Sequence, residues 1–337
     1  MIQEAIYRLS KKEDLPEILL RESFNEIIEE KASPVQISAF LMGLSMKGET
    51  EEEIFATVKF FREHAVKIKA PEGTIDIVGT GGDKSGTFNV STVTSFVVAG
   101  AGVPVAKHGN RSASSQCGSI DVLEELGINV NMTPQMAERC LFECGMTVLF
   151  APIYHPAMKS VASVRRELKI RTIFNIIGPM LNPAEVKHQL LGVFSKDYME
   201  IIGRVLLRLG SKDIMVVHSE DGLDEITVTG KTYIVRAKDG KIMSTQIYPE
   251  DVGIKRAFLK DIKGADKKQN AKIALDILRG QRGHCRDMVL LNAAGALQVA
   301  GVVSDFKEGI EIAKESIDSG KAYNKLEELR KFTNIKG

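Results

Sequence analysis

The sequence predicts a protein of two parts, a small helical domain followed by a larger α/β domain with a central sheet. The chain has 337 residues, which is more than one hydrophobic core usually organises, so two structural units are expected. Apolar residues recur at helical spacing through residues 1–67. From Thr74 onward, short apolar runs alternate with helical patterns, and this alternation is typical of a sheet covered by helices.

Helices are expected throughout the N-terminal part, because its apolar residues repeat every three or four positions. Ile2, Ile6 and Leu9 form the apolar stripe of the first helix. Ser33 followed by Pro34 is typical of a helix start, with a capping side chain and a proline in the first turn. Three further helices are expected over 15–30, 35–46 and 51–67.

The rest of the chain is expected to form strands separated by helices. A polar stretch around Pro71 leads into a first strand that ends at a glycine-rich loop. Asp121 and Glu124 have the spacing of a capping box, so a helix is expected to open at Asp121. Strands are expected over 75–78, 103–106, 147–150, 189–194, 214–218 and 232–236, and helices over 90–101, 121–126, 196–209, 270–278, 286–300 and 306–332.

Charge balance and cysteine content argue against several classes of protein. The 45 basic and 44 acidic residues give a formal net charge of +1, so no broad surface for nucleic acid or for an anionic membrane is expected. The N-terminus has no apolar core of the kind a secretion signal needs, and no apolar run approaches the roughly 20 residues that span a bilayer. Four cysteines are too few for a disulfide framework in a chain this long. Reduced, mostly buried thiols and a cytoplasmic location are therefore expected.

Two glycine-rich loops carry the strongest chemical signal. The first, over 79–92, leaves the end of an expected strand, and the second, over 107–119, combines cations with several hydroxyls. Glycine lets the backbone approach a ligand closely, while free N–H groups, hydroxyls and cations suit phosphate. Asp83 and Lys84 stand where a Walker loop and a dinucleotide fingerprint need glycine. The loops therefore predict a site for a polyphosphorylated small molecule of another kind.

Some of these loop residues also have a purely structural interpretation. The first glycine loop could be only a turn, since such loops are common. The side chains of 89–92 could cap the helix that they begin, or leave its N–H groups to a phosphate. A lone histidine such as His108 is usually structural, but this one stands among polar neighbours at the expected ligand edge. For residues 89–92, the nearness of the glycine loop favours phosphate binding.

Two further segments have both a purely structural and a functional interpretation. Asp224 and Glu225 follow the strand expected over 214–218 and could belong to a solvated loop. At a strand end that faces a diphosphate, however, adjacent carboxylates suit Mg²⁺, which takes few ligands from protein and the rest from phosphate and water. Arg165 is by default a surface arginine on a helix. If it faces the site, its planar guanidinium suits a substrate carboxylate.

Six motifs occur in order along the chain: GTGGD, NVST, KHGNRSASSQCGS, HPAMK, VRRELKIRTIFNIIGPMLNP and HSEDGLDEIT. Together they closely resemble the anthranilate phosphoribosyltransferases of tryptophan biosynthesis. The related pyrimidine nucleoside phosphorylases share a KHGNR-like loop but lack the TFNVST and VRRELKIRTIFN patterns. The resemblance implies a nucleoside phosphorylase/phosphoribosyltransferase-like fold and a homodimer. It implies a helical domain over 1–70, onto which about 155–187 packs back, and an α/β domain over 71–337.

The resemblance also implies a reaction, a metal and one set of ligand-binding residues. The phosphoribosyl group of 5-phosphoribosyl 1-diphosphate would pass to the amine of anthranilate, giving N-(5-phosphoribosyl)anthranilate and diphosphate, with Mg²⁺. The residues implied to bind phosphoribosyl diphosphate are Gly79, Gly82, Asp83, Thr87, Asn89, Val90, Ser91, Thr92, Lys107, His108, Gly109, Asn110, Arg111, Ser112, Ala113, Ser114, Ser115 and Ser119.

Smaller sets are implied for the metal and for the second substrate. Lys107 and His108 would act by electrostatics or positioning, and no residue is implied to form a covalent intermediate. The implied metal ligands are Ser91, Asp224 and Glu225. The residues implied to contact anthranilate are Gly79, Asn110, His155 and Arg165.

Two departures from the family pattern and two alternative functions remain. Lys169 replaces an expected glycine after Leu168, and a non-glycine residue in a left-handed helix cap costs roughly 1–2 kcal/mol. His284 and Cys285 replace a Gly-Pro-type continuation.

The alternatives are a pyrimidine nucleoside phosphorylase and a relative that binds phosphoribosyl diphosphate or nucleic acid without transferase activity. The near-neutral charge and the presence of both HPAMK and Arg165 argue against the second.

Overall fold

The centre of the molecule is a mixed sheet of seven strands in the order β3-β2-β1-β4-β5-β6-β7. The computed structural model describes residues 1–81, 86–111 and 117–335. Strands β1 to β5 are parallel, and β6 and β7 extend the sheet antiparallel at one edge. The strands are β1 (Ile75–Gly79), β2 (Val105–Gly109), β3 (Met146–Phe150), β4 (His188–Gly192), β5 (Asp213–Ser219), β6 (Thr232–Lys238) and β7 (Lys241–Ile247).

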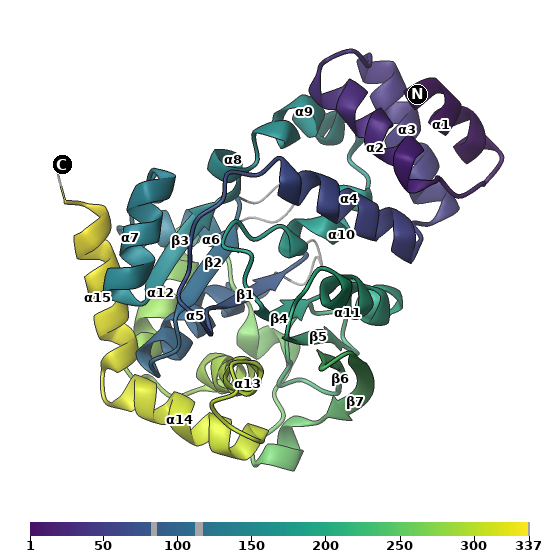
Figure 1. Ribbon diagram of the computed structural model, residues 1–337. Helices are drawn as coiled ribbons and strands as arrows, with labels where there is room; N and C mark the ends of the chain where they lie inside the picture. Colours follow the sequence, from purple (N-terminus) through teal and green to yellow (C-terminus); the bar gives the residue numbers. More distant parts are fainter. Residues whose placement is uncertain (82–85, 112–116, 336–337) are drawn as a thin grey trace.

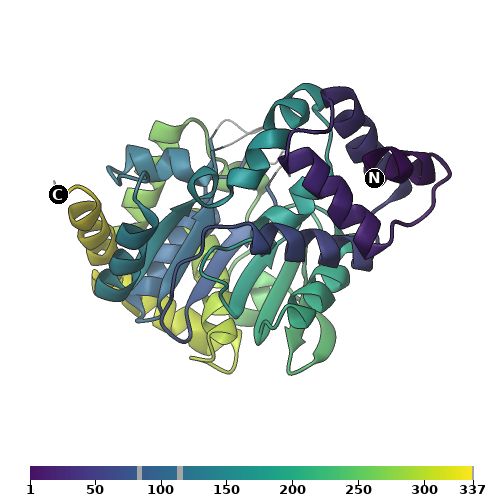
Figure 2. The ribbon, with the colours of Figure 1, turned by 45° about the horizontal axis from the view of Figure 1, so that its top comes forward.

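Four helices precede the sheet and lie at one end of the molecule, with the C-terminal helices at the other end (Figures 1 and 2). Ser33 and Thr50 cap the third and fourth of them, and each takes part in a capping box with the side chain three residues later. The helix start expected at Ser33 and Pro34 is thereby confirmed. The helices are α1 (Ile2–Ser10), α2 (Glu17–Ile28), α3 (Pro34–Lys47) and α4 (Glu51–Glu63).

A segment far along the chain packs against these N-terminal helices. Helix α9 (Lys159–Leu168) contacts α2 and α3, and α10 (Ile173–Ile177) contacts α3 and α4. Phe174 of α10 meets Phe61 edge-on, with ring centroids 5.3 Å apart. One continuous core joins these helices to the face of the sheet that carries Val216. Burial of apolar surface therefore ties the helical bundle to the sheet.

The remaining helices cover both faces of the sheet. Helices α5 and α13 pack against β1 from one side, while α11 packs against β5 and β6 from the other and also contacts α4. In the described parts of the chain, no helix is long and apolar enough to cross a membrane. The helices are α5 (Val90–Gly100), α6 (Ser119–Glu125), α7 (Pro134–Cys144), α8 (Ala151–Tyr154), α11 (Met199–Arg208), α12 (Lys267–Leu278), α13 (His284–Val299), α14 (Phe306–Asp318) and α15 (Lys321–Thr333).

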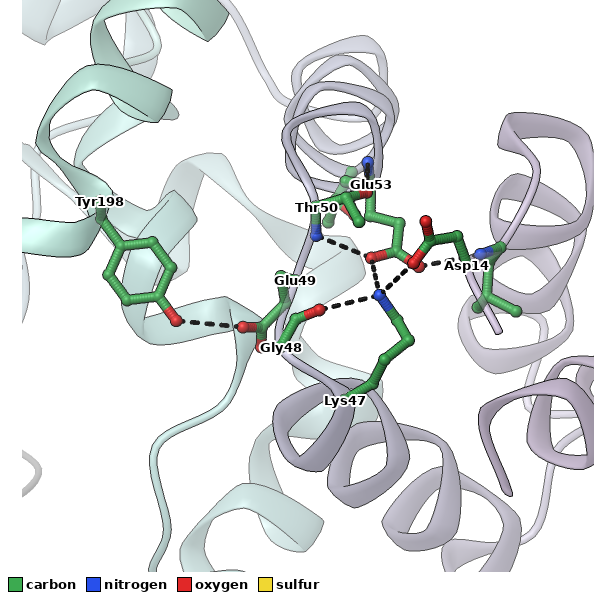
Figure 3. Close-up of polar contacts among 9 residues, drawn as sticks. Asp14, Lys47, Gly48, Glu49, Thr50, Glu53 and Tyr198 are labelled. Atoms are coloured by element: carbon green, nitrogen blue, oxygen red, sulfur yellow. Dashed lines mark hydrogen bonds and ion pairs between the residues drawn. The ribbon is translucent and has the colours of Figure 1, made fainter. Parts of the chain in front are cut away.

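A charged cluster occupies the junction between α3 and α4 (Figure 3). The Lys47 ammonium lies 2.9 Å from the Asp14 carboxylate and 2.8 Å from that of Glu53, which is fully buried. Beside it, the Glu49 carboxylate accepts a hydrogen bond from the Tyr198 hydroxyl at 3.2 Å. Burial raises the pKa of Glu49. Since Tyr198 directly precedes α11, this hydrogen bond links the helical bundle to the α/β part.

Some expected elements are wrong in their bounds. Helix α6 begins at Ser119, and Asp121 accepts from the Gly118 N–H as the third helical residue, so Asp121 is not the cap. The second strand spans 105–109 instead of 103–106. Residues 306–332 form two helices, because Gly320 adopts φ +79° between them. Strand β7 was not expected, since most of its residues are exposed and its pattern carries no apolar run.

Candidate functional site

The carboxyl ends of β1 and β4 form the point at which the strand order reverses. From β1 the sheet continues through β2 and β3 on one side and through β4 and β5 on the other. Open α/β sheets bind their ligands at such a switch point. Gly79 and Gly192, the last residues of β1 and β4, pair with each other there. The first glycine-rich loop therefore begins where the fold favours a ligand.

Both glycines make room for the loop that carries Asp224. A β-carbon at Gly192 would overlap the carbonyl oxygen of Asp224, and one at Gly79 would overlap its carboxylate. The Gly81 N–H donates to the Asp224 carboxylate at 2.7 Å. The acidic loop predicted to bind metal thus lies directly against the first glycine-rich loop.

Helix α5 begins beside these loops, and Asn89 does not cap it. The Asn89 side chain instead donates to the Cys117 carbonyl at 3.4 Å and accepts from the Asn270 amide at 3.0 Å. The Thr92 hydroxyl is buried and has no hydrogen-bond partner in the described part of the chain. The interpretation of Asn89 as a helix cap is therefore wrong. The positive end of α5 remains suited to an anion.

The ammonium of Lys107 lies inside the protein, under the ligand edge. Lys107 is 1% exposed and donates to the Ile77 carbonyl at 2.9 Å and to the Ser91 hydroxyl at 3.3 Å. Burial lowers the pKa of Lys107, and the negative charges of Asp76 and Glu225 oppose that shift. Two of the other predicted residues thus act on the Lys107 ammonium: Ser91 by a hydrogen bond and Glu225 by its charge.

Two histidines meet on the other side of Lys107. His108 of β2 and His155, which follows α8, approach with their Nε2 atoms 3.2 Å apart. Both are buried. A hydrogen bond between two Nε2 atoms needs one neutral acceptor ring. Burial lowers the pKa of His155 to about 4 and that of His108 well below its usual value, so both rings are neutral at pH 7.

Arg165 lies on α9 and is partly buried. Its guanidinium carbon is 5.0 Å from the ring centroid of Phe174. Burial lowers the pKa of Arg165, and within the described ranges no acidic side chain opposes that shift. A shielded guanidinium without an acidic partner suits the carboxylate of a ligand. The helix ends at Lys169 in the left-handed conformation, with φ +51°, at the position where the resemblance implies glycine.

Other predicted residues are engaged within the protein or lie outside the described ranges. The Arg111 guanidinium pairs with Glu124 at 2.6 Å and lies over the ring of Phe150. Asn110 is exposed, and its side-chain oxygen accepts from the Arg111 N–H. Thr87 forms an isolated antiparallel β-bridge with Lys263. Gly109 packs against Ser119, the first residue of α6. Gly82, Asp83, Ser112, Ala113, Ser114 and Ser115 lie outside the described residues.

Sequence reasoning missed two buried polar residues beneath the site. Asp76 of β1 is fully buried, and Asn182 is 2% exposed and donates to its carboxylate at 2.8 Å. A carboxylate inside the apolar run IDIV is the signal that could have indicated Asp76. For Asn182 there is no comparable local signal, because its partner lies 106 positions away.

Comparison with known proteins identifies the family. Residues 72–323 match the model of the glycosyl transferase family, a/b domain, and residues 3–65 match that of the helical bundle domain of the same family. The anthranilate phosphoribosyltransferase of Desulfitobacterium hafniense (strain Y51) is 51% identical over 329 residues, which cover 98% of either chain. This chain belongs to the anthranilate phosphoribosyltransferase family. The resemblance found in the sequence motifs is thereby confirmed.

Other members of the anthranilate phosphoribosyltransferase family agree with this assignment. The protein of Persephonella marina is 50% identical over 336 residues and 99% of both chains. The crystal structure of the Thermus thermophilus enzyme superposes with a TM-score of 0.92 at 39% identity, covering 98% of this chain and 99% of that one. The Saccharomyces cerevisiae enzyme, solved in complex with PRPP and Mg, has a TM-score of 0.91 at 28% identity over 98% and 97% of the two chains. The predicted fold class is therefore confirmed.

Proposed function

We propose that this glycosyltransferase moves the phosphoribosyl group of 5-phosphoribosyl 1-diphosphate to the amine of anthranilate, as part of tryptophan biosynthesis. The products are N-(5-phosphoribosyl)anthranilate and diphosphate. The observation that carries the proposal is the convergence of Gly79, Ser91, Lys107 and Asp224 at the switch point of the sheet. Membership in the anthranilate phosphoribosyltransferase family supports it independently.

The diphosphate is proposed to lie between the N-terminus of α5 and the loop after Gly79. Oriented N–H groups at a helix start bind anions by hydrogen bonding and by the helix dipole. The Lys107 ammonium is too buried to be a surface contact, so it acts through the Ser91 hydroxyl and through its positive field. Fixed positive charge at this position stabilises the charge that develops on the leaving diphosphate. For the predicted ligands outside the described ranges, the proposal rests on the family resemblance alone.

Magnesium fits the acidic loop only together with phosphate oxygens. Across residues 1–81, 86–111 and 117–335, no three His, Cys, Asp or Glu side chains gather so as to hold a metal by themselves. Mg²⁺ typically takes one or two carboxylates and completes its octahedron with phosphate and water. We assign Asp224, Glu225 and the Ser91 hydroxyl as its protein ligands. Positive charge from Mg²⁺ bound there would offset the charge on the departing diphosphate.

Anthranilate is proposed to contact Gly79, Asn110, His155 and Arg165. The planar guanidinium of Arg165 would hold the substrate carboxylate in two parallel hydrogen bonds. The amine of an aniline is unprotonated at neutral pH, so the reaction needs alignment of two substrates more than a strong base. The neutral pair of His155 and His108 agrees with this, because it brings no positive charge toward the amine.

The assembly, the domain division and the location are proposed as follows. A homodimer is supported by Val35, Met42 and Met46 of α3, which are 78%, 40% and 69% exposed at a spacing that places them on one face. The division into 1–70 with about 155–187 and 71–337 is supported by the packing of α9 against α2 and α3 and of α10 against α3 and α4. The four free cysteines support a reducing, cytoplasmic location. The net charge of +1 favours small-molecule substrates over nucleic acid or membrane as partners.

A fluorescence assay tests the activity. Anthranilate is mixed with phosphoribosyl diphosphate, Mg²⁺ and the protein, and magnesium-dependent loss of anthranilate fluorescence with release of diphosphate is expected. Phosphorolysis of thymidine or uridine without anthranilate turnover would support a pyrimidine nucleoside phosphorylase instead.

The metal assignment has its own test. Replacing Asp224 and Glu225 together by Ala should abolish magnesium-dependent turnover while the fold survives. Asp221→Asn is the matched control, since it removes one charge from the same loop and keeps the acceptor for the Thr227 hydroxyl. An unchanged magnesium requirement in the double variant would show that the two acids do not ligate the metal.

A further inference from the structure

Strands β1 and β2 are neighbours that separate toward the ligand edge. They pair at a single position, Ile75 with Val105. By contrast, β1 pairs with β4 at five successive positions, and β2 pairs with β3 at five. The ladder between β1 and β2 is therefore open over the residues that lead to Gly79 and Gly109. Buried backbone groups along such an opening require other hydrogen-bond partners.

Three side chains fill the opening and supply those partners. The Asp76 carboxylate accepts from the His108 backbone N–H at 3.2 Å. The Lys107 ammonium donates to the Ile77 carbonyl at 2.9 Å. The Asn182 amide donates both to Asp76 and to the carbonyl of the residue before Lys107, each at 2.8 Å. Three backbone groups, the Ile77 carbonyl, the Ala106 carbonyl and the His108 N–H, are thus hydrogen-bonded by side chains instead of by the neighbouring strand.

Charge is balanced inside this opening. Asp76 is fully buried, and burial raises its pKa to about 6, while Lys107 and the hydrogen bonds from Asn182 and His108 hold it down. In return, the negative charge of Asp76 raises the pKa of Lys107, whereas the burial of Lys107 lowers it. Asp76 and Lys107 form no direct ion pair, so each charge favours the other through the electric field across the opening.

We propose that Asp76 is a positioning residue of the active site. Together with Asn182 it holds the β2 backbone on both sides of Lys107, at Ala106 and His108, and so places the Lys107 ammonium against Ser91. The inference rests on the proposed function. Asp76 acts on the diphosphate through Lys107 and on the anthranilate side through His108, whose ring meets His155. It contacts neither substrate itself, because it lies fully within the sheet.

Asp76→Asn tests the charge, since it keeps a carbonyl oxygen for the His108 N–H and removes the negative charge. The expected result is a loss of about tenfold or more in kcat/KM for phosphoribosyl diphosphate, with the KM for anthranilate changed by less than about twofold. Asp213→Asn is the matched control. Asp213 is also a buried sheet carboxylate and pairs with Arg236 and Lys238, but it begins β5, two strands away from β1, and neither of these cations is a predicted ligand residue. The control should lower the melting temperature and leave both kinetic constants unchanged.

A double-mutant cycle with Lys107→Met separates positioning from simple support of the sheet. If Asp76 acts through Lys107, Asp76→Asn combined with Lys107→Met is no slower than Lys107→Met alone. The double variant should also melt higher than Asp76→Asn alone, because no unpaired charge remains. If the activity losses of Asp76→Asn and Lys107→Met multiply in the double variant, the proposal is overturned. So would wild-type kinetics for phosphoribosyl diphosphate in Asp76→Asn, whereas an inactive wild type would refute the proposed function instead.

A second variant keeps the proposal testable if Asp76→Asn does not fold. Asn182→Ala leaves both charges in place and removes the amide that orients the Asp76 carboxylate. The expected result is a rise of about tenfold in the KM for phosphoribosyl diphosphate with a smaller effect on anthranilate. Equal effects on both substrates, or none, would contradict a role for Asp76 in placing Lys107.

Discussion

Replacing Arg165 by Ala tests how the second substrate is recognised. Arg165 is partly buried on α9 and lies over the ring of Phe174, and no acid in the described ranges affects its pKa. Among residues 1–81, 86–111 and 117–335, the substitution therefore breaks no ion pair. Its effect on anthranilate binding measures the contact between the guanidinium and the substrate carboxylate.

The size of the effect follows from the hydrogen bonds that are lost. A hydrogen bond to a charged group is worth about 1.5–3 kcal/mol, which is roughly ten- to a hundredfold in binding. The KM for anthranilate should rise by that factor, and the KM for phosphoribosyl diphosphate should stay nearly unchanged. Loss of the contact with Phe174 should lower stability by about 0.5–1 kcal/mol, which is too little to unfold the protein.

The assay is steady-state turnover with each substrate varied in turn. Arg166→Ala serves as the matched control, because Arg166 is the next residue on the same helix and is exposed. Arg165→Lys should recover only part of the loss, since lysine carries the charge without the planar fork. Equal weakening of both substrates in Arg165→Ala would indicate a folding role. No effect on either would place Arg165 outside the site and refute the reasoning.

Three further substitutions test the structure around the site. Lys47→Met should lower the free energy of unfolding by about 3–5 kcal/mol, because it leaves Glu53 buried without its cation; an unchanged urea midpoint would contradict this. Burial lowers the pKa of His155 to about 4 from 6.5, so the unfolded chain takes up its proton first as the pH falls. Stability should therefore decline from pH 6.5 toward pH 4, less steeply in His155→Gln, and identical acid unfolding curves would refute this. Gly192→Ala should displace the Asp224 backbone and weaken activation by magnesium, and a wild-type magnesium titration would argue against that crowding.

Local signals predicted most of the secondary structure and the position of the site. Ser33 and Pro34 mark a helix start through their own chemistry, and the glycine-rich loops follow strands whose apolar runs are plain. Lys107 was predicted to follow the end of a strand, whereas the structure places it in the middle of β2. Its burial was not foreseen, because that depends on a strand opening that no local pattern encodes.

Contacts between distant residues account for what was missed. His108 and His155 are 47 positions apart, and neither carries a sign that it meets the other. The pairing of Arg111 with Glu124 joins residues 13 positions apart, one following β2 and the other on α6. Asp76 and Asn182 come together only because the segment after α10 returns to the sheet. In each case tertiary packing, and not local propensity, decides the role of the residue.

A crystal structure with phosphoribosyl diphosphate and Mg²⁺ bound would test the central claim most directly. The account predicts the diphosphate at the N-terminus of α5, beside Gly79 and Ser91, with Mg²⁺ between it and Asp224. A competing pocket of about 200 Å³ lies at the start of α13, and its charged lining residues are Asp261, Asp276, Arg282 and Arg286. Diphosphate bound in that pocket, with none at the ends of β1 and β4, would contradict the account.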